Sequence, residues 1–315
     1  MRLARWLGLL IMLAATGYFI LELIEHRQIF REIAWTASGI MALLASIATM
    51  VLVIFVGGLI WHQLLRDQGL STPPLVAVRI VALSQIAKYL PGNVGHMVGQ
   101  VALARTAGIP VGVSVTTLVM STVWLTAIGI GVGGPGLVEL AANRNIDWLP
   151  TITPLGLIIL GGGLVFAPWV AVIILNRFLP RLSARLGNGT PVVVPSLGAA
   201  VMLSLGFLLS FLLFGLMLHL QARWLFGVVD VNLLQFTLLF ASAWVVGYLV
   251  PGAPGGVGVR EALMLLLLTP TTGAAVAAAL GVTMRVATLL GDGVAFLAGL
   301  GLARWGRRRQ HASPS

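Results

Sequence analysis

The 315-residue chain contains no cysteine and few charged residues. The absence of cysteine excludes disulfides, thiolate metal sites and thiol nucleophiles. Charged residues make up only 9% of the chain, whereas a soluble domain usually carries about 25%. This shortage of charge excludes an ordinary soluble protein.

Apolar sequence takes the place of the missing charge. Hydrophobic residues make up 58% of the chain, and its mean hydropathy is +1.02. Several apolar runs reach the length of about 20 residues that a helix needs to cross a bilayer. Such runs are much longer than the alternating strands of a membrane barrel. The sequence therefore predicts an all-α, polytopic helical membrane protein.

Two kinds of apolar segment follow one another along the chain. Two segments, 74–107 and 232–269, contain a Pro-Gly break between a helix-length run and a shorter one, and we expect them to form re-entrant hairpins. The glycine-rich run GVGGPG (131–136) is predicted to be the turn that ends a span. Six uninterrupted runs are predicted to cross the membrane, at about 6–24, 39–61, 111–133, 152–176, 196–220 and 272–303.

The two broken segments resemble each other. YLPGNVGHMVGQVAL (89–103) aligns with YLVPGAPGGVGVREAL (248–263) after one gap, and a long apolar run follows each. Matching Gly/Pro-interrupted segments in two halves point to the binding site of a transporter built from inverted repeats. We expect half-repeats at about 74–133 and 232–303, within one membrane domain at 1–303. The identical pairs are Tyr89/Tyr248, Leu90/Leu249, Pro91/Pro251, Gly92/Gly252, Gly95/Gly255, Ala102/Ala262 and Leu103/Leu263.

The distribution of Lys and Arg predicts the orientation. If the six spans cross and both hairpins return to the face they enter from, the basic residues divide unequally between the two sides. One side receives Arg2, Arg5, Arg66, Arg105, Arg177, Arg181, Arg185, Arg304, Arg307, Arg308 and Arg309. The other receives only Arg27, Arg31, Arg144 and Arg223. The positive-inside rule then places both termini and the basic tail 304–315 in the cytoplasm, and the two hairpins enter from opposite faces.

The net charge of +10 is thus explained by membrane topology, and we expect no nucleic-acid partner. The five histidines are scattered without a metal-binding spacing, and the chain has no Walker A loop. We therefore expect no metal and no cofactor.

Six charged residues remain at membrane depth, where charge is costly and typical of functional sites. Arg79 lies near a helix end, where its side chain can reach the interface. Lys88 directly precedes the first break, and it either faces a cavity or caps the helix C-terminus. The other four are Arg260, Glu261, Arg285 and Asp292.

Arg260 and Glu261 follow the glycines of the second break. Glycine lets backbone N–H groups approach a ligand, a helix N-terminus binds anions, and arginine adds a fork suited to phosphate. Glu261 could hold a proton or a cation, or pair with another arginine such as Arg285 to stabilise the bundle. Arg285 and Asp292 lie two helical turns apart, so we expect both to point into the same interior of the helix bundle. They either bind substrate there or form a buried structural pairing.

At these two motifs the sequence resembles the lysylphosphatidylglycerol synthase transmembrane region family, a flippase-like group of integral membrane proteins. The resemblance covers most of the chain and rests on AKYLPGNVGHMVGQVALARTAGIP in the first half and VPGAPGGVGVREALM in the second. Many members carry G-G-D-x-x-R in the first motif, where this chain has GNVGHMVGQ, with Gln100 at an expected charged position. The second run is similar to the family pattern P-x-x-P-G-G-x-G-x-R-E, which falls on Pro251, Pro254, Gly255, Gly256, Gly258, Arg260 and Glu261.

The resemblance also implies a function. The family includes the membrane half of proteins that aminoacylate phosphatidylglycerol and move the product outward, and stand-alone relatives encoded near glycolipid and polysaccharide genes. We expect a stand-alone member without the soluble synthase domain, and hence no enzyme activity.

We expect a translocase that moves a phosphate-bearing lipid, such as a phospholipid or a polyprenyl-phosphate-linked lipid, between leaflets of a bacterial inner membrane. The alternative is a non-transporting partner or regulator of a glycosyltransferase or a lipid-modifying enzyme. A homo-oligomer is compatible with the sequence. The predicted substrate-binding residues are Lys88, Pro91, Gly92, Asn93, Pro251, Pro254, Gly255, Gly256, Gly258, Arg260, Glu261, Arg285 and Asp292.

Overall fold

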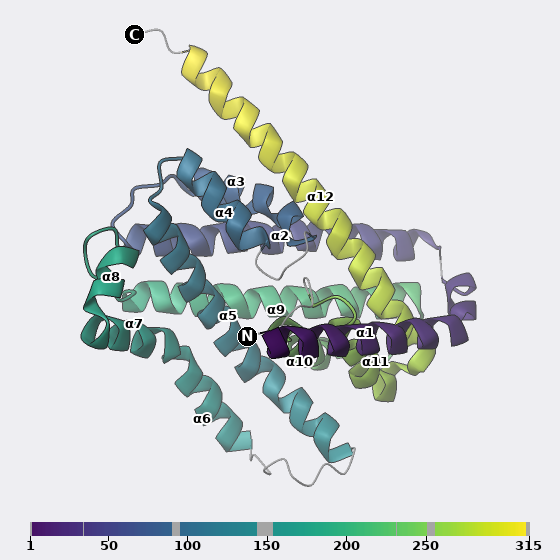
Figure 1. Ribbon diagram of the computed structural model, residues 1–315. Coiled ribbons are helices and arrows are strands. Elements are labelled where there is room, and N and C mark those ends of the chain that lie inside the picture. Colours follow the sequence, from purple (N-terminus) through teal and green to yellow (C-terminus); the bar gives the residue numbers. More distant parts are fainter. Residues whose placement is uncertain are drawn as a thin grey trace.

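The structure is a computed structural model, which describes residues 2–33, 35–89, 95–143, 154–230, 232–250 and 256–312. Within these ranges every regular element is a helix (Figure 1). In the described part of the chain, four helices are long and apolar enough to cross a membrane. They are α2 (Ala37–Asp67), α5 (Val111–Asn143), α9 (Leu197–Leu225) and α12 (Ala274–Ala312). The predicted fold class, a polytopic all-α membrane protein, is confirmed.

Two of the long helices begin with the same kind of cap. The hydroxyl of Thr36 accepts a hydrogen bond from the Gly39 N–H at the start of α2, at 3.2 Å. The hydroxyl of Ser196 accepts one from the Ala199 N–H at the start of α9, also at 3.2 Å. A side-chain acceptor satisfies one of the N–H groups that the first turn of a helix leaves free. Local sequence therefore fixes where both helices begin.

The two Pro-Gly-broken segments each form a pair of short helices. The first hairpin consists of α3 (Pro74–Ser84), the 3-10 helix η2 (Gln85–Tyr89) and α4 (Gly95–Thr106). The second hairpin consists of α10 (Leu233–Leu249) and α11 (Val259–Thr272). The 12 residues of α4 rise only about 18 Å, too little to cross a hydrocarbon core of about 30 Å.

The helices of each hairpin pack against each other. At the open end of the second hairpin, the Gln235 amide of α10 donates to the Thr271 hydroxyl of α11 at 3.3 Å. The chain therefore returns close to the place from which the hairpin started.

The helices follow one order twice: long, short, short, long. The first set is α2, α3, α4 and α5, and the second is α9, α10, α11 and α12. Their packing is reciprocal, because α3 contacts α12 while α10 contacts α5, and α2 contacts α9. Figure 1 shows α2 and α9 side by side and running in opposite directions.

Segments predicted to share one side of the membrane meet at one end of the bundle. The Gln68 side chain, just after α2, exchanges hydrogen bonds of 2.9 and 3.2 Å with the Val193 backbone, just before α9. The Asp67 carboxylate accepts the Ser196 N–H at 3.0 Å. Near the start of α5, the Thr116 hydroxyl donates to the Leu186 carbonyl at 3.3 Å. These contacts bring the connectors 62–73 and 177–195 together.

One predicted span is interrupted. Residues 152–176 were expected to form one helix, but the structure has α6 (Pro154–Val165) and α7 (Ala167–Phe178), followed by the short α8 (Pro180–Leu186). The break lies at Phe166, two residues before Pro168. Proline has no N–H to continue the helical ladder and crowds the preceding turn. The prediction of one uninterrupted span is therefore wrong.

The predicted turn at 131–136 is also wrong, because α5 continues through Pro135 to Asn143. Close packing against α10 accounts for the continuation. A Cβ at Gly133 would lie 2.5 Å from the Ser242 backbone nitrogen, and the Ser242 hydroxyl donates to the Gly133 carbonyl at 2.5 Å. The glycines that suggested a turn instead let two helices approach.

The remaining helix, α1 (Arg2–Glu25), is followed by the 3-10 helix η1 (Arg27–Arg31). It packs against α11 and α12, beside the second hairpin. The expected first span, 6–24, falls within α1.

Candidate functional site

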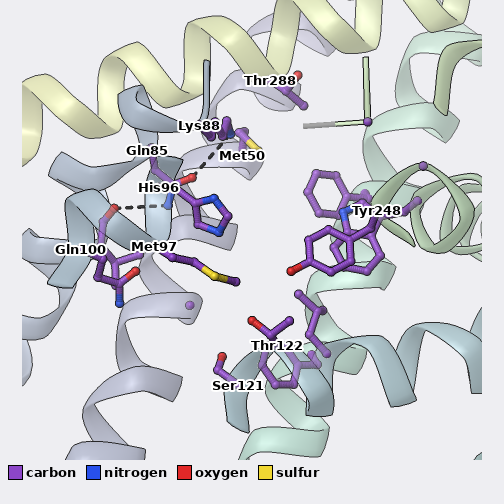
Figure 2. Close-up of a pocket in the computed structure, with 18 of the residues that line it drawn as sticks. Met50, Gln85, Lys88, His96, Met97, Gln100, Ser121, Thr122, Tyr248 and Thr288 are labelled. Atoms are coloured by element: carbon purple, nitrogen blue, oxygen red, sulfur yellow. Dashed lines mark hydrogen bonds between the residues drawn. The ribbon is translucent and has the colours of Figure 1, made fainter. Parts of the chain in front are cut away.

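A cavity of about 290 Å³ lies between the two hairpins, bordered by α2, α5, α9 and α12 (Figure 2). Its apolar wall includes Met50, Trp61, Phe207, Phe214 and Trp244. Its polar lining comprises Gln85, Lys88, Tyr89, His96, Gln100, Ser121, Thr122, Tyr248, Arg260, Arg285 and Thr288. The cavity therefore gathers ionisable side chains from elements that are up to about 200 residues apart in the chain.

The first hairpin contributes Lys88 from η2. Its Nζ lies 2.5 Å from Oδ2 of Asp292 on α12, a carboxylate with no exposed surface. The Tyr89 hydroxyl donates to the same oxygen of Asp292, and Lys88 also donates to the Gln85 side-chain oxygen at 3.5 Å. Of the two roles open to Lys88, the structure shows the cavity-facing one.

The second hairpin contributes Arg260 and Glu261 from the first turn of α11. The Glu261 carboxylate accepts the Gly258 N–H at 2.7 Å, which caps the helix. Its other oxygen lies 3.3 Å from the Arg260 guanidinium and 3.5 Å from that of Arg285. The pairing of Glu261 with Arg285 is therefore present, and Arg260 shares the same carboxylate.

Glycine permits the backbone path into α11. Gly256 and Gly258 have φ values of 71° and 79°, in the left-handed region that favours glycine. A Cβ at Gly258 would lie 1.8 Å from the Thr16 hydroxyl of α1. A Cβ at Gly247 on α10 would lie 3.1 Å from that of Arg260. These glycines let α10 and α1 close around the start of α11 and hold Arg260 at the cavity.

Helix α12 connects the two hairpins. Arg285 contacts Glu261 of the second hairpin, and Asp292 contacts Lys88 of the first. The two residues are seven positions apart, about 10 Å along the helix, on one face. Thr288 lies between them and also lines the cavity. The prediction that Arg285 and Asp292 share one interior face agrees with this geometry.

The cations and the carboxylates hold different positions around the cavity. Lys88, Arg260 and Arg285 line it, whereas Glu261 and Asp292 are not part of the described lining. Both carboxylates are buried, with exposed fractions of 5% and 0%. Within the described ranges, the Arg260 Nε is a buried donor without a partner. The described surface of the cavity is therefore positively charged.

The structure describes seven of the predicted site residues. Lys88, Gly256, Arg260 and Arg285 line the cavity. Glu261 and Asp292 pair with those cations, and Gly258 donates its N–H to Glu261. The other predicted residues lie outside the described ranges; they are Pro91, Gly92, Asn93, Pro251, Pro254 and Gly255.

Eight of the polar residues that line the cavity are absent from the predicted site residues: Gln85, Tyr89, His96, Gln100, Ser121, Thr122, Tyr248 and Thr288. Two of them, Tyr89 and Tyr248, are an identical pair in the internal alignment, which was a usable signal. Gln100 is a third, and it aligns with Arg260. Ser121 and Thr122 lie in an apolar helix and give no comparable signal. Among the described residues, no group of three or more His, Asp or Glu could hold a metal ion.

A family model described as "Lysylphosphatidylglycerol synthase TM region" matches residues 5–295. The chain belongs to this family. The match includes both hairpins and every described residue that lines the cavity. A comparison with curated proteins finds no match.

Membership of the lysylphosphatidylglycerol synthase transmembrane family connects the protein with membrane lipid metabolism or lipid movement. Arg260 and Glu261, which end the family-like pattern, meet Arg285 at the cavity. Gln100, the departure from the pattern of many members, also lines the cavity and is only 4% exposed. The features that carried the resemblance therefore converge on one site.

Proposed function

We propose that the protein is a lipid translocase whose cavity receives a phosphate-bearing head group while the lipid tails remain in the bilayer. The observation that carries the proposal is the positively charged lining, with Lys88, Arg260 and Arg285 facing the cavity. Charge is costly within a membrane, and cations that face a cavity there are typical of a substrate pathway.

The cations retain donors for an anionic ligand. A guanidinium carries five N–H donors in a planar fork that matches phosphate oxygens. Arg260 donates one hydrogen bond to Glu261, at 3.3 Å, and its Nε is buried without a partner in the described ranges. Arg285 makes a single ion-pair contact of 3.5 Å. A phosphate in the cavity would bind these donors without removing Glu261 from its capping bond with Gly258.

The doubled helix order supports movement between leaflets. We propose that the half-repeats 74–133 and 232–303 are inverted and open the cavity to one leaflet at a time, as inverted-repeat transporters do. The antiparallel arrangement of α2 and α9 and the reciprocal packing of α3 on α12 and α10 on α5 support this proposal.

The proposed orientation, with both termini in the cytoplasm of a bacterial inner membrane, can be tested by labelling. Thr190 and Val229 are exposed and belong to connectors that we expect on opposite sides of the membrane. Each can be replaced by a single cysteine in this cysteine-free chain. Thr190→Cys should react from the cytoplasmic side and Val229→Cys from the outer side. Reaction of both from the same side would contradict the orientation.

The test of function is head-group binding and lipid flipping by purified protein in liposomes. Arg260→Ala should weaken binding of the head group about 10- to 150-fold, because a charge-assisted hydrogen bond contributes about 1.5–3 kcal/mol. Arg260→Lys should lose less, since it keeps the charge but not the fork. Arg223→Ala is the matched control, because Arg223 is an exposed cation outside the cavity.

Size-exclusion chromatography checks the folding of each variant. A folded Arg260→Ala protein with undiminished binding and transport would remove Arg260 from the site. That outcome would favour the alternative function, a non-transporting partner of a glycosyltransferase or a lipid-modifying enzyme.

A further inference from the structure

We propose that the head group is the phosphate ester of an uncharged polyol, such as glycerol, inositol or a sugar, rather than of an amine. This inference rests on the proposed function and names the class of its substrate. It depends on how charged, neutral and aromatic side chains are distributed around the cavity.

The polar lining is divided in space. In Figure 2, Lys88 and Thr288 lie toward α12, whereas Gln100, Ser121 and Thr122 lie away from it. Arg285 belongs to α12 itself, and Arg260 to the helix packed against it. A phosphate held by the cations near α12 would direct the rest of the head group toward the neutral polar side chains.

An amine would find no opposing charge in the described lining. Neither carboxylate lines the cavity. Asp292 binds Lys88 and Tyr89 through Oδ2, and Glu261 binds Gly258, Arg260 and Arg285; within the described ranges the other oxygen of Asp292, Oδ1, is buried without a partner. The segments 90–94 (LPGNV) and 251–255 (PGAPG), outside the described ranges, contain no acidic residue. The three cations and the two carboxylates paired with them leave a net charge of +1 (3 − 2). This charge repels an ammonium group more strongly across a low-dielectric cavity than it would in water.

The neutral side chains offer the hydrogen bonds that hydroxyl groups need. Gln100 lines the cavity although it is only 4% exposed. An amide can both donate to and accept from a hydroxyl group. A ligand that supplies hydroxyl groups can therefore exchange hydrogen bonds with this amide.

An aromatic pair lines the cavity on the side that Figure 2 shows opposite Gln100. Trp244 and Tyr248 of α10 stack with ring centroids 4.9 Å apart and planes only 7° from parallel, and both line the cavity. A flat aromatic surface packs against the C–H groups of a polyol, while nearby polar groups bind its hydroxyls. An ammonium group can also bind an aromatic face, and tighter binding of an amine compound would reveal it.

The experiment compares two soluble head-group analogues that differ only in their terminal group. Glycerophosphoglycerol and glycerophosphoethanolamine share the phosphodiester, and their binding to the full chain in nanodiscs can be measured by calorimetry. We expect the glycerol compound to bind at least about tenfold more tightly. Equal or tighter binding of the ethanolamine compound, or no binding of either, would overturn the inference.

Variants locate the preference within the cavity. Gln100→Leu should bring the two affinities close together, whereas Lys88→Met should weaken both compounds alike. Val119→Ala is the control, because Val119 lies on the exposed face of α5, the helix that carries Ser121 and Thr122. An unchanged preference in folded Gln100→Leu, with folding checked by thermal unfolding, would overturn the assignment of the polyol end.

A transport measurement separates the inference from the proposed function. Tail-labelled phosphatidylglycerol and phosphatidylethanolamine are reconstituted with the protein, and their flipping is compared. If glycerophosphoglycerol binds preferentially but neither lipid moves, translocation is wrong and the recognition stands. If both lipids move equally and neither analogue is preferred, translocation stands and the inference is wrong.

Discussion

The first and second hairpins have the same helix order but place their charges differently. In the first, Lys88 precedes the break and pairs with Asp292, which another helix supplies. In the second, Arg260 and Glu261 follow the break, and Glu261 also caps its own helix. The position that aligns with Arg260 in the first hairpin is Gln100.

This difference shows how two similar hairpins can build an unequal cavity. The first hairpin depends on α12 for its counter-charge, whereas the second has one within its own first turn. The charged groups gather near α12, and Gln100 leaves a neutral surface elsewhere. Substitutions in the two hairpins should therefore differ in cost.

The largest effect is expected at the counter-charge that α12 supplies to the first hairpin. Asp292→Asn leaves Lys88 without a carboxylate partner, and breaking a buried ion pair costs about 3–5 kcal/mol. Thermal unfolding in detergent measures this loss. The double variant Lys88→Met/Asp292→Asn should recover most of the stability but not head-group binding.

Asp230→Asn is the control for that prediction, because Asp230 is exposed and lies outside the cavity. If Asp292→Asn were as stable as the parent, the first hairpin would not depend on α12. The two hairpins would then not differ in where their stabilising counter-charge comes from.

The next effect concerns the glycines around the breaks. Gly258→Ala should cost about 2–4 kcal/mol, because positive φ and a Cβ only 1.8 Å from the Thr16 hydroxyl act together. Gly256→Ala should cost about 1–2 kcal/mol, since its φ is positive but its Cβ contacts begin at 3.4 Å. In the first hairpin, Gly99→Ala should change stability by less than about 1 kcal/mol, because higher helix propensity offsets its 3.2 Å contact with Ala87.

The same thermal unfolding measurement ranks the three glycine variants. A cost at Gly99 equal to that at Gly258 would remove this difference between the hairpins. A loss of transport with unchanged stability at Gly256 would assign that glycine to ligand approach.

A smaller effect is expected at the second hairpin's own carboxylate. Glu261→Gln should cost about 1–3 kcal/mol, because the amide oxygen can still accept the Gly258 N–H while both arginines lose a charged partner. Head-group binding should strengthen, since Arg260 and Arg285 are then free for phosphate. Calorimetry and thermal unfolding measure the two changes, with Glu32→Gln at an exposed site as the control. A loss as large as that of Asp292→Asn would contradict the distinction between the two counter-charges.

The smallest effect is expected at the open end of the second hairpin. Gln235→Ala removes the 3.3 Å hydrogen bond to Thr271, which should cost about 0.5–1.5 kcal/mol. Transport should be unchanged, because both residues lie outside the cavity lining. Impaired transport in a folded variant would indicate that the hairpin ends take part in opening.

Much of the fold could be predicted because membrane helices obey local rules. A span needs a long apolar run, and within lipid its backbone must satisfy its own hydrogen bonds. The two wrong predictions, the turn at 131–136 and the single span at 152–176, both concern the effect of proline and glycine on a helix. Pro135 is tolerated within α5, where Gly133 packs against Ser242, whereas the helix breaks near Pro168. Sequence alone does not reveal at which proline the packing of a neighbouring helix keeps the chain helical.

The candidate site could be predicted in part for a similar reason. Arg260, Glu261, Arg285 and Asp292 were identifiable because charge is rare in so apolar a chain. The pairing of Lys88 with Asp292 was not predicted, because 204 positions separate them and no local pattern connects them. Tyr248 and Gln100 were visible in the internal alignment, but their position at the cavity depends on how the hairpins pack.

By itself, the sequence determined the all-helical membrane fold, the two broken segments and the charged residues at membrane depth. These features are local, because hydrophobicity and backbone hydrogen bonding act over one helix at a time. Only the tertiary structure decided that α12 contacts both hairpins, that three cations line the cavity and that neither carboxylate belongs to its described lining. These outcomes depend on side-chain packing between helices distant in the chain, where close contact and low dielectric determine which charges pair.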